Sequence, residues 1–326
     1  LCCWACFLVL SGAVFGPLDI AARRDPWIFG LAALLIFAYQ TLDSLDGIQA
    51  RRNGASGPLG EFVDHWFDSI NAFLIPLGMA LAFPIVPPAV AAVAVFLAAS
   101  AAWLTSGAIR DSGVMKFGVV SGEEVLTITY LFFLAVWATG YDFWAKPSIL
   151  GIAPVSLVYA LIPLAFALSS ILSMASVSGL GEYAAAMGSV LPALVWTLLA
   201  LRGHRSALAL GGLIICFSAS RFSGDVLRDR LVGLEYRSLQ PDILAIDAVL
   251  LASVLVPDLS PMMPIYVACA ATSWLALSLV LQFSRTTARI REVTGVALFQ
   301  PVPRAAAASK RPAFARPPLQ IRRRSR

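Results

Sequence analysis

Four aspartates lie in one short region of the sequence, between residues 41 and 70, and apolar segments flank this region on both sides. The four are Asp43, Asp46, Asp64 and Asp68. If both parts of the region are helical, the spacings i, i+3 and i, i+4 place each pair of aspartates on one helical face. The linking sequence RNGASGPLG is short, so the two helices would be antiparallel neighbours whose acidic faces can meet. The sequence therefore predicts a site where four carboxylates converge.

The residue type in this cluster indicates metal-ion chemistry. Four carboxylates beside apolar segments do not all stay ionised unless cations neutralise them. Ligands that offer only oxygen favour hard cations such as Mg²⁺, Mn²⁺ or Ca²⁺ over Zn²⁺. Two divalent ions would balance the four charges, and such a pair stabilises both the attacking and the leaving oxygen in phosphoryl transfer. We expect two Mg²⁺ or Mn²⁺ ions as cofactors bound by the four aspartates.

Small residues and an arginine accompany the aspartates. Gly47, Ala50 and Gly60 would let a phosphate ester or a base approach the backbone closely. Arg51 lies four residues after Gly47 on the same strip, and its guanidinium offers a planar set of donors to phosphate oxygens. We expect these four residues to contribute to binding of a phosphate-containing substrate.

Two titratable residues next to Asp64 are candidates for proton transfer. Glu61 and His65 are four residues apart, on the face that adjoins Asp64. His65 is one of two histidines in the chain, and an imidazole can remove a proton from a hydroxyl near neutral pH. His65 could instead donate a hydrogen bond to a carboxylate that binds metal, and this alternative stays open.

The composition of the chain indicates a membrane protein. Of its 326 residues, 59% are hydrophobic and 13% are charged, whereas a soluble domain carries about 25% charged residues. Apolar runs predict about ten transmembrane helices, near residues 1–17, 27–42, 62–84, 86–108, 124–140, 148–175, 185–201, 206–220, 243–257 and 262–283. We therefore predict an all-α fold, a polytopic integral membrane helical bundle, in one domain that spans residues 1–284.

Basic residues predict the orientation of the bundle and a separate tail. From Arg285 to the end, eleven residues are Arg or Lys and one, Glu292, is acidic. We expect residues 285–326 to form a disordered cytoplasmic tail that lies against anionic membrane lipids and binds no nucleic acid. Loops on the same side as residues 41–70 hold most of the other Arg and Lys residues, so the aspartate cluster is predicted to face the cytosol.

The spacing of the aspartate region carries a resemblance to a known family. From Asp43 to Asp68 the pattern is D-x2-D-G-x2-A-R-x8-G-x3-D-x3-D. It resembles the signature of the CDP-alcohol phosphotransferase family at all eight fixed positions. The segments QARRNGASGPLGEFVDHWFDS and WLTSGAIRDSGVMKFGVVSGEE resemble the eukaryotic choline and ethanolamine phosphotransferase branch of that family.

This resemblance implies a function and a cellular setting. Enzymes of that branch transfer phosphocholine or phosphoethanolamine from CDP-choline or CDP-ethanolamine to diacylglycerol, which yields phosphatidylcholine or phosphatidylethanolamine and CMP. The family also implies a ten-helix fold, usually a homodimer, in endoplasmic reticulum or Golgi membranes. Family members carry an interfacial segment and, near the start of the first helix, an Asn that contacts the nucleotide. Neither precedes Leu1, so we expect that the sequence lacks its natural beginning.

The resemblance also bears on the general base. Glu61 and His65 resemble the base proposed for the eukaryotic branch, whereas the last aspartate, here Asp68, has been given that role in prokaryotic relatives. We expect His65, assisted by Glu61, to remove the proton, and Asp68 stays an alternative. Trp66 is the aromatic residue that the sequence places near the site, and it is a candidate for a cation–π contact with choline.

Two other functions fit parts of the sequence. Acidic residues within membrane helices also bind cations in transporters, but a transporter predicts inverted repeats and broken helices in both halves. Here the four aspartates are concentrated in one predicted helical hairpin, at residues 41–70. A catalytically inactive membrane scaffold of the same fold is the second alternative. Turnover of CDP-choline with and without Mg²⁺ distinguishes both from the transferase.

Overall fold

The computed structural model describes residues 2–15, 25–53, 56–83, 85–112, 120–174, 180–202, 206–232, 240–256 and 260–295. Within these ranges the chain is almost entirely helical and forms no β-strand. The extended backbone there includes one β-bridge, between Ile149 and Ile152. The predicted all-α class is confirmed.

Ten long helices and one short helix lie in the described residues. They are α1 (Cys2–Phe15), α2 (Pro26–Arg52), α3 (Pro58–Ala82), α4 (Pro88–Ser112), α5 (Gly122–Thr139), α6 (Tyr141–Ala145), α7 (Pro154–Met174), α8 (Leu180–Ala200), α9 (Ala207–Val232), α10 (Pro241–Leu255) and α11 (Met263–Thr294). Each long helix coincides with one predicted apolar run, whereas the sequence does not predict the short α6. α11 continues past the domain boundary predicted at residue 284, so the first residues of the predicted tail are helical rather than disordered.

Four helices are long and apolar enough to cross a membrane by length and composition, namely α2, α5, α9 and the Met263–Val293 part of α11. Most of the apolar stretch of α9 is buried inside the bundle, whereas less than a third of the apolar stretch of each of the other three is buried. Exposed side chains such as Leu34, Leu131 and Leu277 are unfavourable in water and favourable against lipid tails. These helices support an integral membrane protein, while the total of about ten spans remains a prediction.

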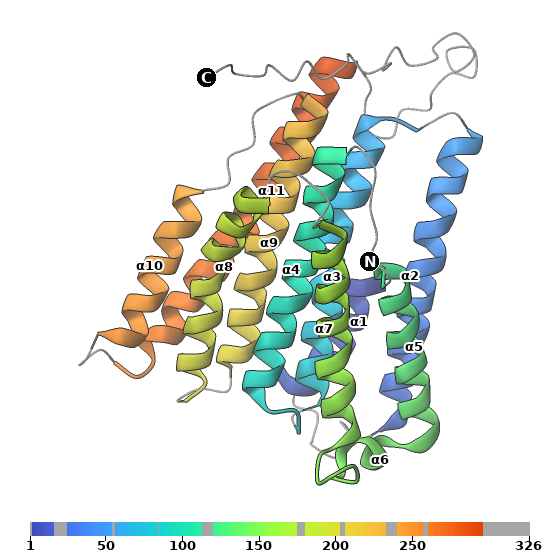
Figure 1. Cartoon of the computed structure of the whole chain (residues 1–326), viewed down its shortest axis with the longest axis vertical. Helices are drawn as coiled ribbons and strands as arrows, with labels where there is room; N and C mark the ends of the chain where they lie inside the picture. Colours follow the sequence, from blue (N-terminus) through green and yellow to red (C-terminus); the bar gives the residue numbers. More distant parts are fainter. Residues whose placement is uncertain are drawn as a thin grey trace.

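The central helix of the bundle is α9, which packs against α3, α4, α8 and α11 (Figure 1). At one side of the bundle α2 pairs with α5, and at the other α10 packs against α8 and α11.

The two helices that carry the aspartates, α2 and α3, run in opposite directions, as predicted (Figure 1). Their main contacts are with other helices, because α2 packs against α5 and α1, and α1 also packs against α3. The expected meeting of the acidic faces of α2 and α3 is found near their linked ends, while α1 packs against both helices. A short link keeps only the linked ends of two helices close together. The position of the rest of each helix depends on the apolar residues that it buries against other helices.

Local sequence signals set the ends of the two helices. The Asp25 carboxylate accepts a hydrogen bond from the backbone N–H of Trp27 at 3.4 Å and so caps α2. Pro26 and Pro58 lie in the first turns of α2 and α3. Proline suits these positions because the first backbone N–H groups of a helix have no partner within it. Both groups of aspartates consequently lie on helix rather than in the link.

The end of the bundle that carries the aspartates is also rich in arginine. α2, α9 and α11 all end there, where α3 begins (Figure 1). The last turns of these three helices contain Arg52, Arg230 and Arg291. Cations are favourable at helix C-termini because carbonyl groups without helical partners point outward there. This arginine-rich end is the one predicted to face the cytosol.

Candidate active site

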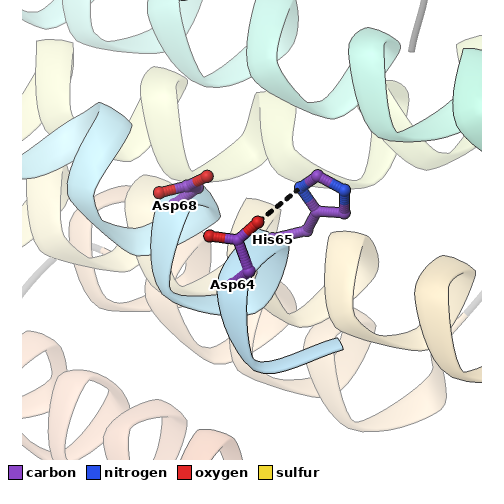
Figure 2. A group of neighbouring side chains, drawn as sticks. All are labelled: Asp64, His65 and Asp68. Atoms are coloured by element: carbon purple, nitrogen blue, oxygen red, sulfur yellow. Dashed lines mark ion pairs between the residues drawn. The ribbon is translucent and has the colours of Figure 1, made fainter. Parts of the chain in front are cut away.

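The four predicted aspartates meet around Asp64. Carboxylate oxygens of Asp43, Asp46 and Asp64 lie within 4.8 Å of one another. A second group consists of Asp64, His65 and Asp68, whose ligand atoms also lie within 4.8 Å of one another. Figure 2 shows the side chains of the second group on α3, with the His65 ring beside the Asp64 carboxylate. The ends of α2 and α3 thus bring the four carboxylates together.

This cluster carries more negative charge than the described residues neutralise. Within the described ranges, no Lys or Arg forms an ion pair with any of the four aspartates. Asp46 is exposed, and the other three are partly buried. Carboxylates that are close together and partly removed from water repel one another unless a cation lies between them. The donor set, oxygen ligands with one imidazole nearby, fits Mg²⁺ or Mn²⁺.

His65 presents one nitrogen to the cluster. Its Nδ1 is 4.0 Å from Asp64 Oδ2, which is longer than a hydrogen bond (Figure 2). This Nδ1 is buried and has no hydrogen-bond partner among the described residues. The His65 side chain as a whole is 24% exposed, so another part of the ring reaches the surface. Nε2 is therefore the nitrogen that a substrate can approach.

Asp68 has a partner that the sequence analysis does not identify. The Tyr39 hydroxyl donates a hydrogen bond of 2.5 Å to Asp68 Oδ1, across from α2 to α3. Tyr39 lies four residues before Asp43, on the same face of α2. That spacing is the signal that could have suggested it. The hydrogen bond fixes the direction in which the Asp68 carboxylate points.

Glu61 also has a partner that was not predicted. Arg230, in the last turn of α9, donates a hydrogen bond to Glu61 Oε1 at 2.7 Å, and the two side chains form an ion pair. Glu61 and His65, which were predicted to act together, therefore have different partners. Glu61 binds Arg230, whereas His65 faces Asp64. Nothing in the local sequence signals this contact, because the two residues of the ion pair are 169 positions apart.

The residues predicted to bind phosphate lie near the linked ends of α2 and α3, as the aspartates do. A Cβ atom at Gly47 would lie 3.5 Å from Arg51 Nη1, so the Arg51 side chain folds back over Gly47. Gly60 is exposed, and a Cβ atom there would meet no described atom within 4 Å. Ala50 is half-buried on α2. The open surroundings of Gly60 leave room beside the carboxylates, and the binding roles of these residues remain predictions.

Trp66 lies in the protein core rather than at the open side of the site. Its side chain is 5% exposed, its ring packs against Phe283, and its indole N–H donates a hydrogen bond to Gln282. This position gives no support to the predicted cation–π contact with choline.

Taken together, these features define a helical membrane protein with a carboxylate cluster suited to divalent cations at one end of the bundle. A family model described as CDP-alcohol phosphatidyltransferase matches residues 2–218. The chain belongs to this family, and the enzyme class predicted from the aspartate spacing is confirmed.

Curated relatives each match a little over a third of the chain. Cholinephosphotransferase 1 of Danio rerio is 34% identical over 132 residues, which are 39% of this chain and 34% of the relative. Cholinephosphotransferase 1 of Gallus gallus is 38% identical over 124 residues, 36% of each chain. The "Uncharacterized CDP-alcohol phosphatidyltransferase class-I family protein 3" of Dictyostelium discoideum is 33% identical over 126 residues, 38% of this chain and 32% of the relative. The chain thus spans about a third of the length of the relatives that it matches.

Proposed function

We propose that this protein transfers phosphocholine or phosphoethanolamine from CDP-choline or CDP-ethanolamine to diacylglycerol and releases CMP. The convergence of Asp43, Asp46 and Asp68 around Asp64 is the observation that carries the proposal. Family membership and the relatives named cholinephosphotransferase support a CDP-alcohol as the donor. The diacylglycerol acceptor follows from the resemblance to the eukaryotic branch.

In this proposal the aspartates hold two Mg²⁺ or Mn²⁺ ions, which when bound neutralise the diphosphate and stabilise the attacking and leaving oxygens. Asp64 belongs to both groups of candidate ligands, so the two groups form one site. Tyr39 keeps Asp68 in a fixed orientation through its hydrogen bond. Arg51 donates hydrogen bonds to phosphate oxygens, while Gly47 and Gly60 leave space for the donor.

His65 receives the proton of the acceptor hydroxyl. With Nδ1 buried beside Asp64, Nε2 is free to accept it. The hydroxyl oxygen then forms a bond to the β-phosphorus, and the bond between that phosphorus and the oxygen bridging to the α-phosphate breaks. CMP leaves with this bridging oxygen. The negative charge of Glu61 favours the imidazolium that forms, and the positive charge of Arg230, its ion-pair partner, opposes it.

The proposal includes a setting in the cell. The arginine-rich end of the bundle faces the cytosol, because positive residues concentrate on that side of membrane proteins. CDP-choline, which is soluble, reaches the aspartates from this side, and diacylglycerol reaches them from the bilayer. By the same resemblance the protein acts as a homodimer in endoplasmic reticulum or Golgi membranes.

Turnover in isolated membranes tests the proposal. Membranes that contain the protein are supplied with diacylglycerol and either CDP-[¹⁴C]choline or CDP-[¹⁴C]ethanolamine, and labelled phospholipid and CMP are measured. We expect product with at least one donor in Mg²⁺ or Mn²⁺, and a rate at the level of membranes without the protein after chelation by EDTA, because the carboxylates then repel the diphosphate. Labelled inositol with CDP-diacylglycerol serves as the control reaction. Folded protein that gives no product with either donor would support the inactive scaffold instead.

Replacement of Tyr39 by phenylalanine tests the hydrogen bond to Asp68. Tyr39→Phe keeps the ring and removes the donor to a carboxylate that binds metal. Partners of this kind typically contribute about 10- to 100-fold to metal affinity or activity. We expect the Mg²⁺ concentration for half-maximal CMP release to rise by about that factor. Tyr266→Phe, on an exposed tyrosine of α11, is the matched control. An unchanged Mg²⁺ dependence in Tyr39→Phe would contradict a role of Tyr39 in holding Asp68.

A further inference from the structure

The back of α3 is joined to α9 and α11 by buried hydrogen bonds. Trp66 Nε1 donates to Gln282 Oε1 at 3.3 Å. Gln282 Nε2 in turn donates to Asp225 Oδ1 at 2.7 Å and to the Arg221 backbone carbonyl at 2.8 Å. Gln282 is 6% exposed. A continuous hydrogen-bonded chain thus runs from the α3 residue next to His65, through α11, to α9.

The direction of these hydrogen bonds fixes the Gln282 amide in one orientation. Its oxygen accepts from an indole N–H, which is only a donor. Its nitrogen donates to a carboxylate and a carbonyl, which are only acceptors here. A flipped amide would place donor against donor and acceptor against acceptor. The Gln282 side chain is therefore a rigid strut between Trp66 and Asp225.

The far end of this strut is itself fixed. Arg228 forms an ion pair with Asp225 at 2.8 Å, and the Gln240 side chain donates a hydrogen bond to the other Asp225 oxygen. Gly224 lets α9 approach Gln282 closely, because a Cβ atom at that position would lie 2.5 Å from Gln282 Oε1. Asp225 thus cannot follow a movement of Gln282 without the loss of several contacts.

Aromatic packing adds to the same contact between α3 and α11. The ring of Phe283 packs against Trp66 with centroids 4.8 Å apart, against Phe67 at 5.8 Å and against Phe62 at 6.0 Å. One turn earlier on α3, Arg230 of α9 binds Glu61. Asp64 and His65 lie between these two attachment points.

We propose that Gln282 and Arg230 are positioning residues that fix the turn of α3 carrying Asp64 and His65. They act through Trp66 and Glu61, respectively, and among the described residues neither forms a hydrogen bond or ion pair with the four aspartates. Both lie outside residues 2–218, the part matched by the family model. This proposal rests on the proposed function. A fixed turn increases the rate only if the carboxylates and the imidazole have to meet the reacting groups in one geometry.

A double-mutant cycle tests the strut through Gln282. Gln282→Leu removes the amide, and Trp66→Phe keeps an aromatic ring but removes the indole N–H. We expect each variant to lower kcat for CMP release by up to about 100-fold, because a misplacement of about 1 Å caused by a remote substitution can cost that much. KM for the CDP-alcohol should change little. The double variant should lose no more than the single ones, because both break the same link.

The matched control is Trp196→Phe, which removes a buried hydrogen bond of the same kind, from the indole N–H of Trp196 on α8 to Ser253 Oγ on α10, and does not involve α3. It should leave kcat unchanged. For the second attachment point, Arg230→Met should lower kcat, and Arg230→Lys should restore part of it because the charge next to Glu61 is retained. Gly224→Ala is expected to lower kcat without removal of any polar group, since the added methyl displaces Gln282.

Hydrogen–deuterium exchange of the protein in nanodiscs tests the positioning role independently of the proposed enzymatic function. The amides of residues 59–68 should exchange faster in Gln282→Leu and Arg230→Met than in the wild-type protein or in Trp196→Phe. This measurement needs no turnover, so it stands even if the wild-type protein releases no CMP. Unchanged exchange in this segment, or additive losses of kcat in the double-mutant cycle, would overturn the positioning role.

Discussion

Asp64→Ala is expected to abolish CMP release and to leave the helical bundle folded. Asp64 is the residue shared by the two groups of ligand atoms, one with Asp43 and Asp46 and one with His65 and Asp68. Its loss removes a ligand from both groups at once. Because its side chain is 41% exposed and is not part of the apolar core, the substitution leaves no large cavity.

The experiment compares CMP release and thermal stability of purified Asp64→Ala, Asp46→Ala and Asp142→Ala. Asp142 is a suitable control because it is an aspartate on the short α6, paired with Lys146 at 3.5 Å and separate from the cluster. We expect activity at background level for the first two variants, wild-type activity for the third, and similar melting temperatures for all. Persistent turnover in Asp64→Ala or Asp46→Ala would end the assignment of the aspartates as metal ligands.

Much of the fold could be predicted because apolar length is a strong signal. Each long helix in the described residues coincides with one predicted apolar run. The ends of helices were less accessible to sequence reasoning, since polar residues can continue a helix beyond its apolar part. α9 continues past its predicted run 206–220 to Val232, and α11 continues to Thr294. The contact of both α2 and α3 with α1 could not be predicted, because hydropathy does not encode which helices are neighbours.

The candidate site divides into a local part and a distant part. The spacing of Asp43, Asp46, Asp64 and Asp68 predicts their convergence, because helical geometry relates residues three and four positions apart. Arg230 could not be predicted as the partner of Glu61, since it comes from a helix far along the chain.

The buried polar residues behind α3 illustrate the same limit. Gln282 within an apolar run suggests a hydrogen-bonded position, because an unpaired amide is costly inside a helical bundle. Its partners Trp66 and Asp225 become apparent only once α3, α9 and α11 are placed side by side.

His65→Ala is expected to lower kcat by roughly 10²-fold or more if His65 is the general base. The described contacts favour His65 over the two carboxylates that compete for this role. Glu61 is engaged by Arg230 at 2.7 Å, and Asp68 accepts the Tyr39 hydrogen bond at 2.5 Å. A carboxylate oxygen that already accepts a hydrogen bond from the protein is less available to a substrate hydroxyl, whereas His65 Nε2 has no hydrogen-bond partner among the described residues.

Measurement of kcat at saturating CDP-alcohol and Mg²⁺ distinguishes the candidates for the base. Glu61→Gln and Asp68→Asn are compared with His65→Ala, and His204→Ala, at the only other histidine in the sequence, is the control. If His65 accepts the proton, His65→Ala reduces kcat with little change in the Mg²⁺ requirement, whereas Asp68→Asn raises that requirement because a metal ligand is weakened. A near-normal kcat in His65→Ala would assign proton removal to Glu61 or Asp68, and the variant of the true base would then show the larger loss. The alternative that the sequence leaves open, in which His65 donates a hydrogen bond to a metal-binding carboxylate, would then require Nδ1 and Asp64 Oδ2 to come closer than their present 4.0 Å.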